Sequence, residues 1–246
     1  MKSYFLTLLL SFITVCGYSQ EINIIFQDSV ENHVNNLANT FDYIDEEYDL
    51  SSKVKIASFE GISENSKKLN LASLFNSFAQ KANSLGANSF TIDESIYEVD
   101  NFIKVLISVY YLTPEELNNN FNSYPKNMIY IIGGLNKLKE KGRKIKFNGK
   151  KYLLNSLEYI EYQNEIDREA TISIGGFLGA KLWIKGKEDR LPKYLSPFGF
   201  GLGSGNIGEI GLSVNTGRIY PVQLNIGQFL IHVLNKKQVL TKNKPH

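Results

Sequence analysis

The spacing of apolar residues changes near residue 113 of this 246-residue chain, and that change limits which architectures it can adopt. Between residues 69 and 85 the apolar side chains recur every three or four positions, which predicts an amphipathic helix packed on a sheet. From residue 128 onward, short apolar runs alternate with Gly and Asn turns, which is typical of strands alone. We therefore expect the α+β class, with helices confined to the first part of the chain.

The first part, residues 20–113, is predicted to form one α+β domain in the order β-α-β-α-β-β. Asp28 or Ser29 can cap a helix whose apolar stripe continues to Tyr48. Helices on one face of a small sheet would bury both apolar stripes. The expected helices lie at 28–48 and 69–85, and the expected strands at 22–26, 53–61, 88–92 and 103–111.

Residues 114–127 are rich in Pro, Glu and Asn, and we interpret them as a linker. Residues 128–236 are predicted to be an all-β sandwich or a partly closed barrel, followed by a polar C-terminal tail at 237–246. Asn148-Gly149 predicts a tight hairpin, because both residues tolerate positive φ. The expected strands lie at 128–132, 144–147, 150–154, 158–162, 171–174, 181–185, 207–214, 223–226 and 229–234.

Residues 1–19 have the pattern of a removable export signal. Lys2 precedes an apolar run from Tyr4 to Val15, and Gly17 and Ser19 are small residues at a cleavage site before Gln20. The run is shorter than the roughly 20 residues of a spanning helix, so we expect no transmembrane span in the mature chain. The expected destination is the periplasm, the outer membrane or the medium.

The single cysteine, Cys16, lies inside this signal, so the processed chain would hold no disulfide and no reactive thiol. Cys16 could alternatively be a lipidation site, although Ile13, Thr14 and Val15 match such a motif poorly. The 27 basic and 25 acidic residues nearly balance, and this gives no overall field to recruit nucleic acid. We expect no cofactor and no nucleic-acid partner.

Two segments resemble parts of exported bacterial envelope proteins that carry a small α+β domain followed by a β-sandwich-like domain. The first runs from Val54 to Gly61 and resumes at 79–88, where a helix ends in Leu-Gly-Ala-Asn before a strand. The second combines the strand at 128–132 with the Asn-Gly-Lys hairpin at 148–150. The resemblance implies a fold and a surface or carbohydrate-proximal role, and it carries over no site residue.

One strong charge cluster surrounds the predicted hairpin, and Glu140 is the only acid within it. It could contact an anionic lipid, a glycan or an acidic protein surface of the envelope. Alternatively, the lysines keep the hairpin solvated and guard a sheet edge against pairing. The cluster consists of Lys137, Lys139, Lys141, Arg143, Lys144, Lys146, Lys150 and Lys151.

Other candidate sites have simpler explanations. His33, His232 and His246 are too dispersed for a triad or a zinc site. The glycines between 199 and 208 lack the Lys-Ser/Thr of a phosphate loop, and we expect Trp183 to pack in a core. Four acids on the predicted first helix could collect a cation, but they are equally the solvated face that such a helix needs: Asp42, Asp45, Glu46 and Asp49.

These patterns together favour an exported, non-enzymatic interaction or accessory module, with the basic hairpin as its contact surface. The rival class is a carboxylate-dependent hydrolase of envelope glycans, with two acids facing each other across a cleft. A third possibility is a carrier of small ligands that uses the aromatic residues after Gly176. The sequence names no catalytic residue for any of them.

Overall fold

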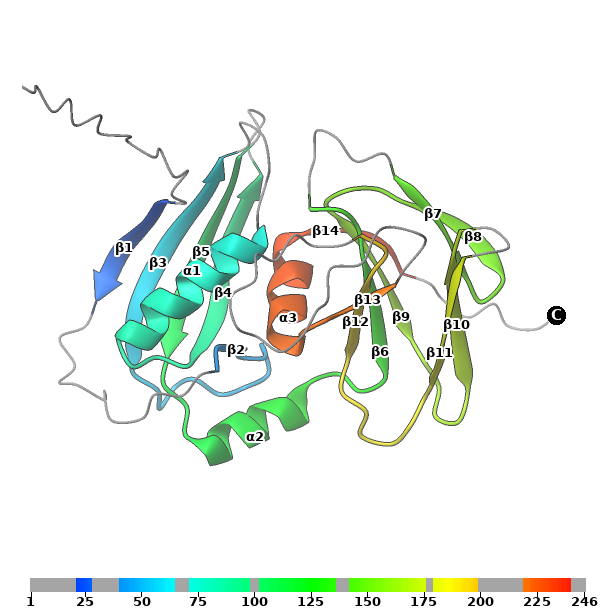
Figure 1. Cartoon of the computed structure of the whole chain (residues 1–246). Helices are drawn as coiled ribbons and strands as arrows, with labels where there is room; N and C mark the ends of the chain where they lie inside the picture. The colour runs from blue at the N-terminus through cyan, green and yellow to red at the C-terminus, as the bar shows by residue number, and fades with distance from the viewer. Residues whose placement is uncertain are drawn as a thin grey trace, which may run out of the picture.

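The computed structural model describes seven ranges of the chain and is mixed α+β, as expected, with most of its residues in strands (Figure 1). Within these ranges, three helices accompany three sheets of five, four and five strands. The described residues are 21–27, 40–64, 71–97, 102–135, 142–175, 179–198 and 219–239.

The first sheet contains five strands in the order β1-β3-β5-β4-β2 and is antiparallel except for the pairing of β2 with β4. Helix α1 (Leu71–Ser84) lies against this sheet and confirms the helix predicted at 69–85. Its apolar stripe is buried against strand residues such as Phe59 and Val105. The strands are β1 (Glu21–Gln27), β2 (Asp42–Tyr43), β3 (Lys55–Glu64), β4 (Ser89–Tyr97) and β5 (Phe102–Tyr110).

The helix predicted at 28–48 is wrong over residues 40–48, which form the short strand β2 and turns. The N–H groups of Asp42 and Ile44 donate to the carbonyls of Asn88 and Phe90, so this segment completes the edge of the sheet. Phe41, with Tyr43 and Ile44, is buried, although not on a helix. The apolar spacing predicted burial of Phe41 and Ile44 but not of Tyr43, and pairing with β4 determined the conformation of the segment. Residues 28–39 lie outside the described ranges.

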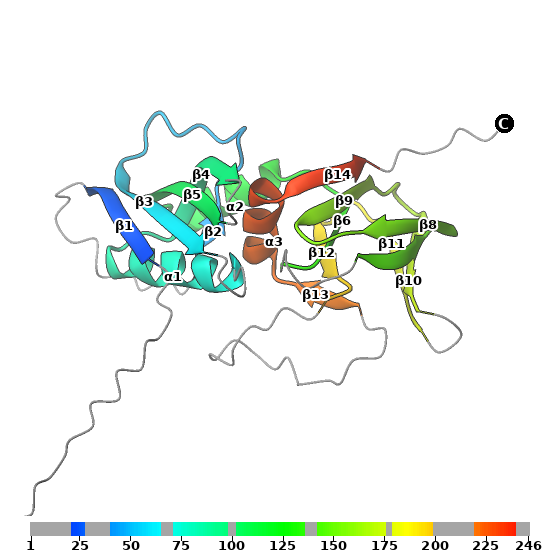
Figure 2. The ribbon, with the colours of Figure 1, turned by 90° about the horizontal axis from the view of Figure 1, so that it is seen from above.

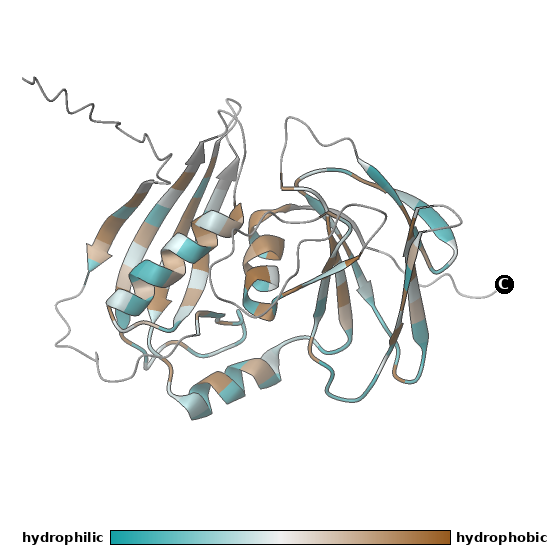
Figure 3. Ribbon diagram, in the orientation of Figure 1, coloured by the Kyte–Doolittle hydropathy of each residue, from teal (hydrophilic) through white to brown (hydrophobic). Residues whose placement is uncertain are grey.

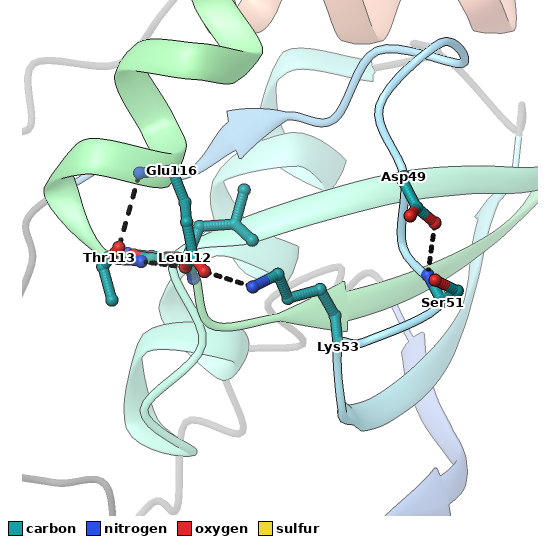
Figure 4. Close-up of polar contacts among 7 residues, drawn as sticks. Asp49, Ser51, Lys53, Leu112, Thr113 and Glu116 are labelled. Carbon is teal, nitrogen blue, oxygen red and sulfur yellow. Dashed lines mark hydrogen bonds and ion pairs between the residues drawn. The ribbon is translucent and has the colours of Figure 1, made fainter.

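A second helix, α2 (Pro114–Ser123), occupies most of the segment interpreted as a linker. Thr113 caps it, because the Thr113 hydroxyl accepts from the N–H of Glu116 and the Glu116 carboxylate accepts from the N–H of Thr113 (Figure 4). The same carboxylate forms an ion pair with Lys53, just before β3. The sequence contains this helix-start signal as Thr-Pro-x-Glu, but the asparagines that follow it favoured the interpretation as a linker.

Asn120 shows why that asparagine run is not a linker. Its side chain is fully buried, and its amide donates to the carbonyl of Tyr43 over 2.7 Å and accepts from the N–H of Asp45 over 2.9 Å. Tyr124 donates its hydroxyl to the same carbonyl. Helix α2 therefore holds residues 43–45 in place on the sheet edge.

The middle sheet contains strands from distant parts of the sequence, in the order β13-β12-β6-β9-β14. Strands β6 and β12 pair in parallel, as do β9 and β14, while β6 and β9 are antiparallel. The last strand includes residues 237–239, which the sequence analysis assigned to the polar tail. The strand predicted at 207–214 lies outside the described ranges. The strands are β6 (Met128–Ile132), β9 (Glu158–Gln163), β12 (Lys193–Ser196), β13 (Tyr220–Val222) and β14 (Asn235–Val239).

The third sheet is antiparallel throughout, in the order β11-β10-β7-β8, and confirms the strands predicted within it. Asn148 and Gly149 form its hairpin turn with φ of 44° and 84°, as predicted. The sheet packs face to face on the middle sheet through an aliphatic core that includes Ile131 and Ile172. Its strands are β7 (Arg143–Phe147), β8 (Lys150–Leu154), β10 (Glu169–Ile174) and β11 (Ala180–Lys185).

Helix α3 (Leu224–Val233) replaces the two strands predicted at 223–226 and 229–234, so that prediction is wrong. An apolar run without alternation fits a buried helix as well as a buried strand, and α3 is apolar around most of its surface (Figure 3). It lies between the first and middle sheets in both views (Figures 1 and 2). Phe229 contacts Phe75 and Phe90, with ring centroids 5.4 and 6.3 Å apart.

Candidate functional site

The outer face of the third sheet collects exposed lysines from three of its four strands, β7, β8 and β11. Inward residues such as Ile145 and Phe147 are buried in the aliphatic core, so the residues that alternate with them point outward. Strands β8, β10 and β11 alternate in the same way. We call this outer surface the lysine face. It comprises Lys144, Lys146, Lys151, Lys181 and Lys185 together with Leu153, Glu169, Thr171, Ser173 and Trp183.

Strand register places three of these lysines in one row. Lys151 is directly opposite Lys146, Lys146 is opposite Ser173, and Ser173 is opposite Lys181. Neighbouring strands lie about 4.8 Å apart, so the row runs roughly 14 Å across the sheet. Side by side on one exposed face, these ammonium groups present a flat, positively charged surface.

Trp183 lies beside this row on the edge strand β11 and is 53% exposed. Its partner across the sheet is Thr171, and Lys181 places its ammonium 4.9 Å from the centre of the indole ring. The sequence analysis expected Trp183 to pack in a core. Exposure contradicts that expectation, and the reason is register: Leu182 and Ile184 take the inward positions on either side.

The lysine face has little internal neutralisation. Lys185 pairs with Asp167 over 3.0 Å, and Glu169 is the partner of Lys185 across the sheet. Among the described residues, no carboxylate forms an ion pair with Lys144, Lys146 or Lys151. Like charges directly opposite each other on a sheet destabilise it, so the Lys146–Lys151 pair is unfavourable in the free protein.

The structure brings together only part of the predicted contact cluster. Lys144, Lys146 and Lys151 share the lysine face, whereas Lys150 is opposite the inward residue Phe147. Arg143 is opposite the buried Leu154, donates to the carbonyl of Pro197 and lies over the ring of Phe198. Both therefore belong to the other side of the sheet. Lys137, Lys139 and Lys141 lie outside the described ranges.

Lys181, Lys185 and Trp183 belong to the face but were not assigned to the cluster. Their signal was present, since Lys-x-Trp-x-Lys places all three on one side of a strand. The missing information was that β11 lies in the same sheet as the hairpin, through β10. The local sequence does not indicate which non-consecutive strands pair or in which register.

A second candidate site lies where the middle sheet meets α3 and residues 40–46. The rings of Tyr130 and Tyr194 stack at 5.0 Å, and the ring of His232 stacks on that of Tyr43 at 4.2 Å. Gly227 allows α3 to lie close to Tyr194, because a Cβ at this position would lie 2.1 Å from Cγ of Tyr194. Tyr194 and Phe198 are buried, so these aromatic residues after Gly176 form no open surface together with Trp183.

Burial shifts the titration of several groups at this junction. Burial raises the pKa of Asp42 to about 6, although a hydrogen bond with Thr40 lowers it. Burial also lowers the pKa of His232, although Glu46 and Asp45 act in the opposite direction. The hydroxyl of Tyr194 is buried without a hydrogen-bond partner in the described part of the chain. Burial, with a smaller contribution from the Glu161 carboxylate, raises the pKa of Tyr159 to about 12.

The acids proposed as a cation-binding helix face do not form one. Asp42 lies in β2 and Asp45 in the following loop, where its carboxylate accepts from the N–H of Glu47. Asp49 accepts from the N–H of Ser51 over 2.8 Å (Figure 4). Within the described ranges, no three His, Cys, Asp or Glu residues are grouped as metal ligands.

Comparison with known proteins adds no name to these sites. No protein-family model matches the chain, and neither a curated protein nor a solved structure does. The resemblance to exported envelope proteins therefore stays a prediction. In the part of the chain that the structure describes, no helix has both the length and the apolar character to span a membrane.

Proposed function

We propose that this chain is an exported, non-enzymatic binding module of the bacterial envelope that holds an anionic partner on the lysine face. Its two facing sheets would act as a β-sandwich platform, and residues 1–19 as the export signal. The observation that carries the proposal is the row of Lys151, Lys146 and Lys181 across one flat, exposed sheet face.

Electrostatics supports an anionic partner. The chain as a whole is nearly neutral, yet the lysine face has five cations and one acid, Glu169. An anion bound between Lys146 and Lys151 would replace their mutual repulsion by two attractive contacts. A face that only guarded the sheet edge would need lysines on the edge strands, whereas Lys144 and Lys146 lie on the inner strand β7.

The test compares two double charge reversals in the mature chain. Lys146→Glu with Lys151→Glu changes the lysine face, and Lys55→Glu with Lys81→Glu makes the same change in net charge at exposed positions in the first sheet and α1. With dextran sulfate as the probe, we expect the face variant to bind at least about tenfold more weakly at low salt, and the control to bind like the wild type. Equal loss in both variants would overturn the proposal.

A second candidate function, the glycan hydrolase, is favoured by the junction rather than by the lysine face. Asp42 has a pKa raised to about 6, as a general acid needs, and Asp45 follows it in the adjoining loop. If this reading holds, the purified protein releases reducing ends from envelope glycan and Asp42→Asn stops the release. Absence of reducing ends with the wild-type protein would remove this candidate.

A further inference from the structure

We infer that the anionic partner is an acidic polysaccharide, with one sugar ring stacked on Trp183 and its acidic groups bound by the flanking lysines. This inference rests on the proposed function, because it specifies the ligand of the same lysine face.

The exposure of Trp183 is the first step. Leaving about half of an indole in water forgoes much of the stabilisation that burial of so large a side chain provides. Edge protection does not explain the residue, because Lys181 and Lys185 already flank it on the same side of β11. A half-exposed indole with the Lys181 ammonium over its ring and Lys185 beside it on β11 is suited to a ligand that has both an apolar face and negative charge.

The polar neighbours of the ring are the second step. Thr171 is directly opposite Trp183, and Ser173 is directly opposite Lys181. Their hydroxyls donate and accept hydrogen bonds, which matches the hydroxyl groups around a sugar ring. The C–H face of a sugar would cover the indole, while a carboxylate or sulfate would pair with Lys181 or Lys146.

The same geometry disfavours a lipid surface. The other large apolar side chain exposed on this side, Leu153, lies on β8, at the opposite edge of the sheet from Trp183. Three strand spacings, about 14 Å, separate β8 from β11. The row of lysines with Ser173 lies between Leu153 and Trp183. Insertion into a bilayer requires a continuous apolar face, and the described residues of this surface form none.

Trp183 is the only tryptophan in the chain, so its fluorescence reports directly on this surface. We would titrate the mature protein with an oligogalacturonide, with the same oligosaccharide methyl-esterified to remove its charge, and with vesicles of anionic phospholipid. We expect saturable quenching by the acidic oligosaccharide alone, weakened as salt increases.

Variants of the two exposed apolar residues separate stacking from charge. We expect Trp183→Ala to weaken oligogalacturonide binding about tenfold by calorimetry, with partial rescue in Trp183→Tyr and no change in the control Leu153→Ala. Binding of polyphosphate, a polyanion without sugar rings, should remain in all three variants, because it depends on the lysines alone.

The outcomes distinguish this inference from the proposed function. If polyphosphate, a polyanion without sugar rings, binds and the oligogalacturonide leaves Trp183 fluorescence unchanged, the glycan inference is wrong and the anionic face stands. If vesicles shift the fluorescence and the oligosaccharide does not, the partner is a lipid and the inference is again wrong. If none of the probes binds, the proposed function fails as well.

Discussion

The two sheets of the C-terminal half share one aliphatic core but have opposite outer faces. The outer positions of the middle sheet include Tyr130, Tyr159 and Tyr194, which are buried beneath α3 and residues 40–46. The outer positions of the third sheet form the lysine face and are open to solvent. Both sheets alternate in the same way, so the residue type at the outer positions records whether another layer covers them.

The covered face also shows what burial does to polar groups. Asp42 and His232 have shifted pKa values there, and the hydroxyl of Tyr194 lacks a partner among the described residues. On the lysine face the polar groups remain available to a ligand. The difference indicates that polar groups cost more stability at the covered junction than on the exposed lysine face, and four predictions test this contrast.

The largest effect is expected from Phe229→Ala, which removes the ring by which α3 covers the junction. Phe229 is fully buried among Phe75, Phe78 and Phe90, so the variant should lose about 3–5 kcal/mol of unfolding free energy in urea titrations. Leu153→Ala, at the 49% exposed position on the other sheet, should lose less than about 0.5 kcal/mol. Similar losses in both would mean that α3 does not seal the junction.

Asp42→Asn should stabilise the protein at neutral pH. Because burial raises the folded-state pKa of Asp42 from 3.8 to about 6, the folded state holds its proton more tightly than the unfolded chain. Asp42 therefore contributes to the stability of the wild-type protein below about pH 4, and this contribution is lost as the pH rises to about 6. We expect the variant to gain on the order of 2 kcal/mol at pH 7 and little at pH 3.5, measured by thermal unfolding at both pH values. A gain of the same size at both would refute the assignment.

Two tyrosine-to-phenylalanine changes in the covered region should have opposite signs. The buried hydroxyl of Tyr194 lacks a partner, so Tyr194→Phe should stabilise by about 1 kcal/mol. The hydroxyl of Tyr124 donates to the carbonyl of Tyr43, so Tyr124→Phe should destabilise by about 1 kcal/mol. Chemical denaturation of both variants checks the pair, and destabilisation by Tyr194→Phe would point to a bound water or ligand at that hydroxyl.

The smallest effect is expected on the lysine face. Lys151→Thr removes the like charge opposite Lys146 and should raise stability by a few tenths of a kcal/mol at low salt, with the gain disappearing at high salt. Lys150→Thr is the matched control, because Lys150 is opposite Phe147 and has no lysine across from it. A salt-independent gain in both variants would indicate β-propensity instead of charge.

Local patterns predicted local structure well. The stripe of α1, the Asn148-Gly149 turn and the strands of the third sheet all follow from neighbours in sequence. Long-range contacts explain the failures: β2 forms because β4 is beside it, and α3 packs on Phe75 and Phe90 from the first part of the chain. Asn120 was read as linker because its partners, Tyr43 and Asp45, are distant in sequence.

In the candidate site, too, local sequence predicted some features, and long-range strand pairing determined the others. The sequence identified the hairpin lysines, since charge clusters are visible locally, but it could not tell that Arg143 turns toward Phe198 or that Lys181 and Trp183 join the face. Those facts depend on which strand pairs with which, through β10.

The position of α3 near the end of the described chain also has a consequence for biosynthesis. Phe75, Phe78 and Phe90 contact Phe229, which the ribosome adds roughly 140–150 residues after them. Until that helix arrives, the first sheet and α1 lack part of their aromatic covering, so the nascent chain cannot complete this core as it emerges. Synthesis must therefore be nearly complete before Phe229 can be buried and this aromatic core can close.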